Sequence, residues 1–216
     1  MVDESERLAE GIIPSRDTVR SKEKNKLLNE IEKIYGKENI ILDLTKTLWG
    51  HRNFHKFNCI GIKNQDVDNY VLLGYSAEHL DKWFFGFDIS FTDNLVSHII
   101  ENPLKQVYAF FLFMLEVDKT VQYFPVPIFF IKNNEGGIST SDNHGKSKPQ
   151  YKINIQKIKG KICLRLAGGE FKDISEFQVN LDNLFNPRLS LLHDEERRKY
   201  EGKIVDKAAL IKQFYQ

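Results

Sequence analysis

The sequence predicts a mixed fold, α/β or α+β, in one domain of 216 residues that is built around a central mixed sheet. Two observations predict it. In the apolar stretch 83–131, an aromatic strand, a buried helix (about 103–117) and a second strand follow one another. Over 151–166, apolar and polar residues alternate in two runs separated by Lys159-Gly160, which predicts a C-terminal hairpin.

The N-terminal third is expected to supply one helix and the first strands. Residues 1–14 are interpreted as a loose arm, and Ser15 or Asp17 can cap a helix that runs to about Tyr35. Gly36 then suits the end of that helix. Short apolar runs bounded by polar turns predict strands at 40–44, 57–63 and 70–74.

The helix at about 103–117 is the predicted centre of the core. Asn102 is a suitable N-cap, and Pro103 suits the first helical position, where its missing N–H costs nothing. Apolar residues follow at helical spacing on one face and continue on the opposite face: Val107, Phe110, Phe111, Leu112, Phe113, Met114 and Leu115. A helix that is apolar nearly all round is buried or spans a membrane. Lys105 and Glu116 bound a run too short to span, because a bilayer needs about 20 apolar residues.

The C-terminal part is expected to add a loop, the hairpin and flanking helices. The Gly-, Ser- and Asn-rich stretch 133–150 predicts a mobile loop. After the hairpin, helices are predicted over 193–200 and from Asp206 to about Phe214.

Composition limits the classes of function. The apolar fraction of 41% argues against a disordered chain, and the net charge of +1 gives no global attraction to nucleic acid or membrane. Cys59 and Cys163 lack the spacing of metal ligands and read as buried thiols. The polar, acidic start is unlike a secretory signal, so the expectation is a cytoplasmic protein with no membrane partner.

With the short strand at 40–44 set aside, the predicted order of elements up to residue 131 is helix, three strands, helix, strand. This order resembles the core of the restriction-endonuclease-like family, often written PD-(D/E)XK. In that family an acid on the second strand and an acid on the third bind a divalent metal, and a Lys two residues after the second acid orients the attacking water. Here Asp68 stands at the start of the second strand and Asp88 lies on the third. The resemblance therefore implies Asp68 and Asp88 as Mg²⁺ ligands.

The sequence departs from the family pattern after the second acid, because position 90 is Ser90 instead of Lys. Lys105, or alternatively Lys63, would have to supply the orienting cation, which gives Asp68, Asp88 and Lys105 as the expected catalytic set. The alternative interpretation is structural: Asp88 caps the helix after it, and Asp68 is a turn residue.

Basic residues in two segments are candidates for phosphate contacts. His51 and Arg52 lie in a segment rich in ligand-binding side chains, and Lys146 lies in the predicted 133–150 loop. His51 and His55 have the i, i+4 spacing of a metal pair on a helix, but Gly50, Asn53 and Phe54 argue against a helix there, and no Cys or carboxylate is near in sequence.

The leading hypothesis is a DNA-binding protein that acts on duplex DNA as a Mg²⁺-dependent endonuclease. The alternative is a non-enzymatic interaction module that engages a protein partner through exposed aromatic residues and the 133–150 loop. The two differ in their expected response to salt, since contacts with a phosphate backbone weaken steeply as salt is added.

Overall fold

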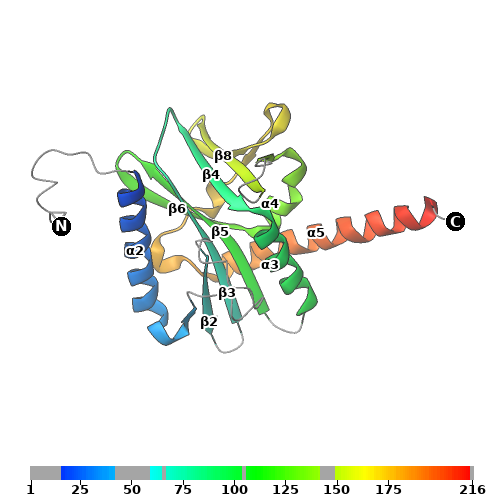
Figure 1. The fold of residues 1–216 in the computed structure, drawn as a ribbon, viewed down its shortest axis with the longest axis horizontal. Helices are drawn as coiled ribbons and strands as arrows, with labels where there is room; N and C mark the ends of the chain where they lie inside the picture. Colours follow the sequence, from blue (N-terminus) through cyan, green and yellow to red (C-terminus); the bar gives the residue numbers. More distant parts are fainter. Residues whose placement is uncertain (1–15, 42–58, 65–66, 104–105, 142–148, 215–216) are drawn as a thin grey trace, which may run out of the picture.

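The computed structural model describes residues 16–41, 59–64, 67–103, 106–141 and 149–214. These residues form two β-sheets and four α-helices: α2 (Arg16–Tyr35), α3 (Ile89–Glu101), α4 (Ile128–Asn133) and α5 (Pro187–Phe214) (Figure 1). The predicted α+β class with a mixed sheet is therefore confirmed.

Sheet A is the mixed sheet, with the strand order β1-β2-β3-β5-β6. Its strands are β1 (Ile40–Ile41), β2 (Cys59–Asn64), β3 (Val67–Ser76), β5 (Gln106–Val117) and β6 (Thr120–Pro127). β3 and β5 are parallel and are joined through a crossover that contains α3, whereas the other pairs are antiparallel.

The predicted helix at 103–117 is wrong, because residues 106–117 form β5, an interior strand of sheet A. β5 pairs with β3 on one edge and with β6 on the other, and its side chains from Ala109 to Leu115 are buried. A strand buried on both faces is apolar at every position, so its sequence cannot be told from a buried helix by periodicity. Asn102 is the C-cap of α3, where its side-chain amide donates to the carbonyl of His98 at 2.8 Å.

The segment predicted as the strand after that helix is divided between two elements. β6 ends at Pro127, and α4 begins at Ile128. With the two-residue strand β1 set aside, the order helix, three strands, helix, strand is formed by other elements than those predicted, namely α2, β2, β3, β4 (Lys82–Asp88), α3 and β5. The structure departs from the predicted single central sheet, because β4 pairs in a second sheet.

Sheet B is antiparallel and contains β4, β7 (Ser139–Ser141), β8 (Gln150–Ile158), β9 (Lys161–Arg165) and β10 (Phe171–Asp173). β4 lies along one edge of β8, and β9 and β7 share the other edge. The predicted hairpin over 151–166 is confirmed as β8 and β9. Part of the predicted 133–150 loop has regular structure, since it includes β7, while 142–148 and the predicted arm 1–14 lie outside the described residues.

The main core lies between the two sheets and α3. Phe85 and Phe87 of β4 pack on Phe111 and Phe113 of β5, with ring centroids 4.9 Å apart for Phe85–Phe113 and 4.6 Å for Phe87–Phe111. Gly74 permits this approach, because a Cβ there would lie 2.7 Å from the ring of Phe85. A second cluster, in which α2 contributes Leu27 and Ile31, fills the opposite face of sheet A.

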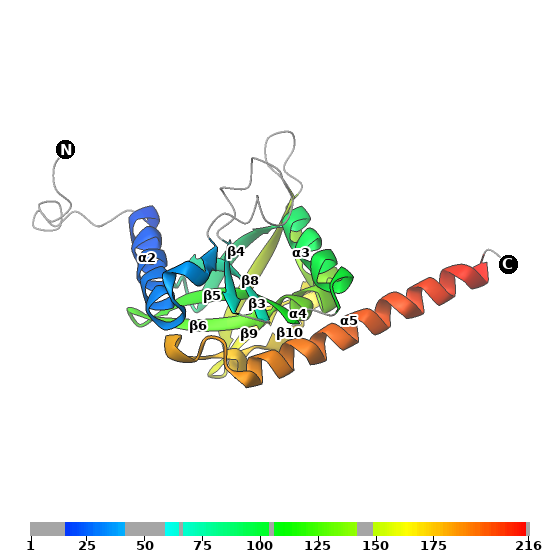
Figure 2. The same cartoon turned by 90° about the horizontal axis from the view of Figure 1, so that it is seen from below.

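The C-terminus forms a single helix in place of the two that the sequence predicted. α5 runs without a break from Pro187 to Phe214, so Asp206 does not begin a new helix. Figures 1 and 2 show its first half against the sheets and its C-terminal half projecting beyond them.

Candidate functional site

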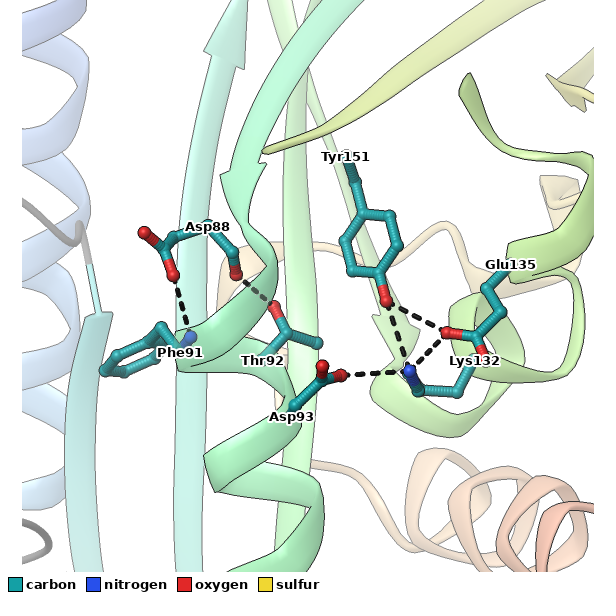
Figure 3. A network of polar contacts seen from close by, with 7 residues as sticks. All are labelled: Asp88, Phe91, Thr92, Asp93, Lys132, Glu135 and Tyr151. Carbon is teal, nitrogen blue, oxygen red and sulfur yellow. Dashed lines mark hydrogen bonds and ion pairs between the residues drawn. The ribbon is translucent and has the colours of Figure 1, made fainter. Parts of the chain in front are cut away.

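Asp88 is the N-cap of α3. Its side-chain Oδ1 accepts a hydrogen bond from the backbone N–H of Phe91 at 2.8 Å (Figure 3). The hydroxyl of Thr92 donates to the backbone carbonyl of Asp88, also at 2.8 Å. The carboxylate is buried. The sequence-based alternative that Asp88 caps the following helix is therefore confirmed.

Asp68 is the second residue of β3, so the interpretation as a turn residue is wrong. Its side chain is buried, and Oδ2 lies 3.5 Å from the hydroxyl of Tyr70. Burial, followed by the charge of Asp68, raises the pKa of that hydroxyl well above its usual range. Lys63 stands opposite Asp68 in the β2–β3 ladder and is exposed.

The two predicted metal ligands belong to different sheets, Asp68 to sheet A and Asp88 to sheet B. In the parts of the chain that the structure describes, no three or more His, Cys, Asp and Glu side chains are grouped so as to hold a metal. Mg²⁺ binding by this pair stays a prediction. Ser90 is exposed in the first turn of α3, while Lys105, His51, His55, Arg52 and Lys146 lie outside the described residues.

A polar cluster that sequence reasoning missed surrounds Lys132 of α4 (Figure 3). Only 7% of this side chain is exposed. Its ammonium donates to Asp93 of α3 at 2.9 Å, to the hydroxyl of Tyr151 of β8 at 3.1 Å, and to Glu135. The Tyr151 hydroxyl in turn donates to Glu135 at 3.0 Å. One lysine therefore connects α3, α4 and sheet B.

The Lys132 cluster is suited to stabilising the fold and not to catalysis. Burial lowers the pKa of Lys132, but the hydrogen bonds with Glu135, Asp93 and Tyr151 outweigh it and hold the pKa above its usual range. Burial raises the pKa of Tyr151 to about 12, although the lysine opposes that shift. A lysine that stays protonated cannot serve as a base or nucleophile at neutral pH. The one sequence signal was a lysine directly after the apolar run 128–131.

The outer surface of sheet B presents a different set of side chains. Trp83, Phe85, Ile153, Ile155 and Leu164 point into the core, so the alternate residues of these strands point outward. We call this surface the open face of sheet B and define it by Lys82, Phe84, Gly86, Gln150, Lys152, Asn154, Gln156, Arg165 and Phe171.

One row of the open face crosses four strands. Phe84 is paired with Asn154, Asn154 with Arg165, and Arg165 with Phe171. Phe84 is 55% exposed and Phe171 is 39% exposed, so two aromatic rings stand in solvent at the ends of the row. Neighbouring strands are about 4.8 Å apart, which separates the two ring positions by about 14 Å. Asn154 and Arg165 lie between them.

Cations flank the aromatic row. Lys152 lies in the row next to it, opposite Gly86, and Lys82 lies in the row on the other side, opposite Gln156. Neither these lysines nor Arg165 forms an ion pair with a residue that the structure describes. Lys161 is different, because it pairs with Asp173 at 2.6 Å and lowers the pKa of that carboxyl to about 2. The open face therefore offers exposed rings, amides and three cations outside ion pairs, and the register places the Lys161–Asp173 pair on the same face.

Comparison of the chain with protein-family models, curated proteins and solved structures finds no match. Among the described helices, none combines the length and apolar character needed to cross a membrane.

Proposed function

We propose that the protein binds single-stranded nucleic acid on the open face of sheet B. The observation that carries this proposal is the row from Phe84 to Phe171, with its exposed rings at both ends and Arg165 within it. Proteins that bind single strands combine aromatic rings, on which bases stack, with cations that contact the backbone.

Single strands fit this surface better than the duplex DNA that the sequence suggested. Bases in a duplex are already stacked on one another, so their faces are not available to Phe84 or Phe171. In a single strand, each base that stacks on an aromatic ring contributes about 1–3 kcal/mol. Lys82, Lys152 and Arg165 would then contact phosphates on either side of the stacked bases.

The resemblance to the restriction-endonuclease-like family adds no support for a nucleic-acid ligand, because the helix predicted at 103–117 is the strand β5 and because β4 pairs outside sheet A. The proposal is limited to binding. Cleavage would require a metal at Asp68 and Asp88, and the carboxylate of Asp88 is already engaged with the backbone of α3.

A protein partner is the second candidate for the same face. The net charge of +1 and the pairing of Lys161 with Asp173 favour it, because both reduce the attraction for phosphate. The salt dependence of binding distinguishes a single-stranded nucleic acid from a protein partner. Binding to a single strand through three cations should weaken with a slope of about −2 in log K against log salt, whereas an apolar protein interface should respond much less.

The test is a titration of a fluorescent oligonucleotide of about 12 nucleotides with the full chain at several salt concentrations. We expect salt-dependent binding that Phe84→Ala weakens by roughly 5-fold or more, since one stacked base is lost. Leu191→Ala is the matched control, because Leu191 is an apolar residue on α5 that is more exposed (68%) than Phe84 (55%). Binding that Phe84→Ala and Leu191→Ala leave equally unchanged would contradict the proposal.

A further inference from the structure

Gly86 is an exposed glycine in the interior of β4, on the open face beside Phe84. A glycine inside a strand often marks a place where a ligand approaches closely. Its backbone does not need a glycine, because its φ lies outside the left-handed region. Gly86 instead leaves space for neighbouring side chains, because a Cβ here would lie 2.8 Å from Oε1 of Gln150 and 3.9 Å from Nζ of Lys152. These two side chains therefore reach over Gly86.

The contact between them fixes the direction of the amide. Nζ of Lys152 donates to Oε1 of Gln150 at 3.3 Å. Because the amide oxygen faces the ammonium, the amide nitrogen of Gln150 is directed elsewhere, with two N–H donors. Lys152 keeps further donors of its own, since an ammonium has three. Beside Phe84, the open face thus presents hydrogen-bond donors.

We propose that Gln150 and Lys152 select the base that stacks on Phe84 and that they favour bases with acceptor edges. Guanine offers O6 and N7, and thymine or uracil offers a carbonyl, whereas adenine and cytosine present an amino donor at the corresponding position. This inference rests on the proposed function, because it names the preferred bases at the same face.

The first measurement compares the affinity of the full chain for thymine, adenine and cytosine oligonucleotides, and for an adenine oligonucleotide that carries central guanines. We expect the thymine and guanine ligands to bind on the order of tenfold more tightly than the adenine and cytosine ligands. Equal affinity for all four ligands would overturn the inference while leaving the proposed function intact. Absence of binding to every ligand would overturn both.

Gln150→Glu is the decisive variant. The substitution keeps the shape and the contact with Lys152 but replaces the amide donors with acceptor oxygens, which suit the amino groups of cytosine and adenine. We expect the preference to reverse, so that cytosine or adenine ligands bind several-fold more tightly than thymine. An unchanged preference in Gln150→Glu would overturn the assignment of Gln150.

Gly86→Ala tests the space beneath the two side chains. The added methyl meets only the ends of the Gln150 and Lys152 side chains and is tight against Gln150 alone, so the fold is retained while the amide is displaced. We expect the ratio of affinities, thymine or guanine ligands over adenine or cytosine ligands, to fall several-fold and to approach one. Gly136→Ala is the control, since a Cβ at Gly136 would meet nothing within 4 Å, and it should keep the preference. A preference retained in Gly86→Ala would count against the inference.

Discussion

Nε2 of His193 accepts a hydrogen bond from the backbone N–H of Ala109 at 3.2 Å. The β5–β6 ladder begins at Phe110, so Ala109 lies just before it and has no pairing partner in β6. A side chain of α5 therefore takes the place of the missing strand partner. The imidazole is fully buried. Its centroid lies 5.1–5.6 Å from the ring centroids of Tyr108, Phe110 and Phe129.

This bond predicts a pH-dependent stability. Burial lowers the pKa of His193, and the neighbouring Asp194 opposes the shift while Arg197 adds to it. Because the folded pKa is lower than the unfolded value of about 6.5, the contribution of the neutral ring is fully present above that value. It is lost as the pH falls through the folded pKa, since the unfolded chain then binds the proton more readily.

The measurement is urea unfolding between about pH 7.5 and pH 5, compared with His193→Gln, which stays neutral over this range. We expect the free energy of unfolding of the wild type to fall more steeply with decreasing pH than that of the variant. His79→Gln, in an exposed turn, is the control and should keep the wild-type slope. Parallel pH profiles for His193→Gln and the wild type would show that the ring does not couple protonation to folding.

Lys132→Met should destabilise the fold. The substitution keeps most of the buried aliphatic volume but removes the charge that Asp93, Glu135 and Tyr151 share. Breaking a fully buried pair costs about 3–5 kcal/mol, and we expect about 1–3 kcal/mol because both carboxylates are partly exposed. Lys161→Met removes an exposed pair and should cost clearly less than Lys132→Met, because solvent screens the pair. Equal losses in chemical denaturation would disprove the special role of Lys132.

Asp88→Ala should lower the free energy of unfolding by about 1 kcal/mol, because it removes the acceptor for the N–H of Phe91. Asp88→Asn should remain close to the wild type, since Asn is an equally good N-cap. A metal ligand would behave differently, because the amide lacks the charge that Mg²⁺ prefers. Thermal unfolding of the wild type and both variants with and without Mg²⁺ checks this, and a stabilisation by Mg²⁺ that the wild type shows and Asp88→Asn lacks would support Asp88 as a metal ligand.

The sequence was sufficient for the fold class and for the β8–β9 hairpin, because alternation over 151–166 is a local signal. It was not sufficient for β5, whose burial on both faces removes that alternation. The open face could not be read from the sequence either. Phe84 and Phe171 belong to strands far apart in the chain, and only the register through Asn154 and Arg165 brings them into one row.

The affinity of Phe84→Ala, Phe171→Ala and the double variant for a single-stranded oligonucleotide decides whether nucleic acid binds on the open face of sheet B. Loss of both rings should weaken binding by roughly 25-fold or more, while the salt slope of about −2 stays the same, because Lys82, Lys152 and Arg165 remain. Leu191→Ala should bind as the wild type does. If the double variant of a folded protein keeps its full affinity, the open face of sheet B is not where nucleic acid binds.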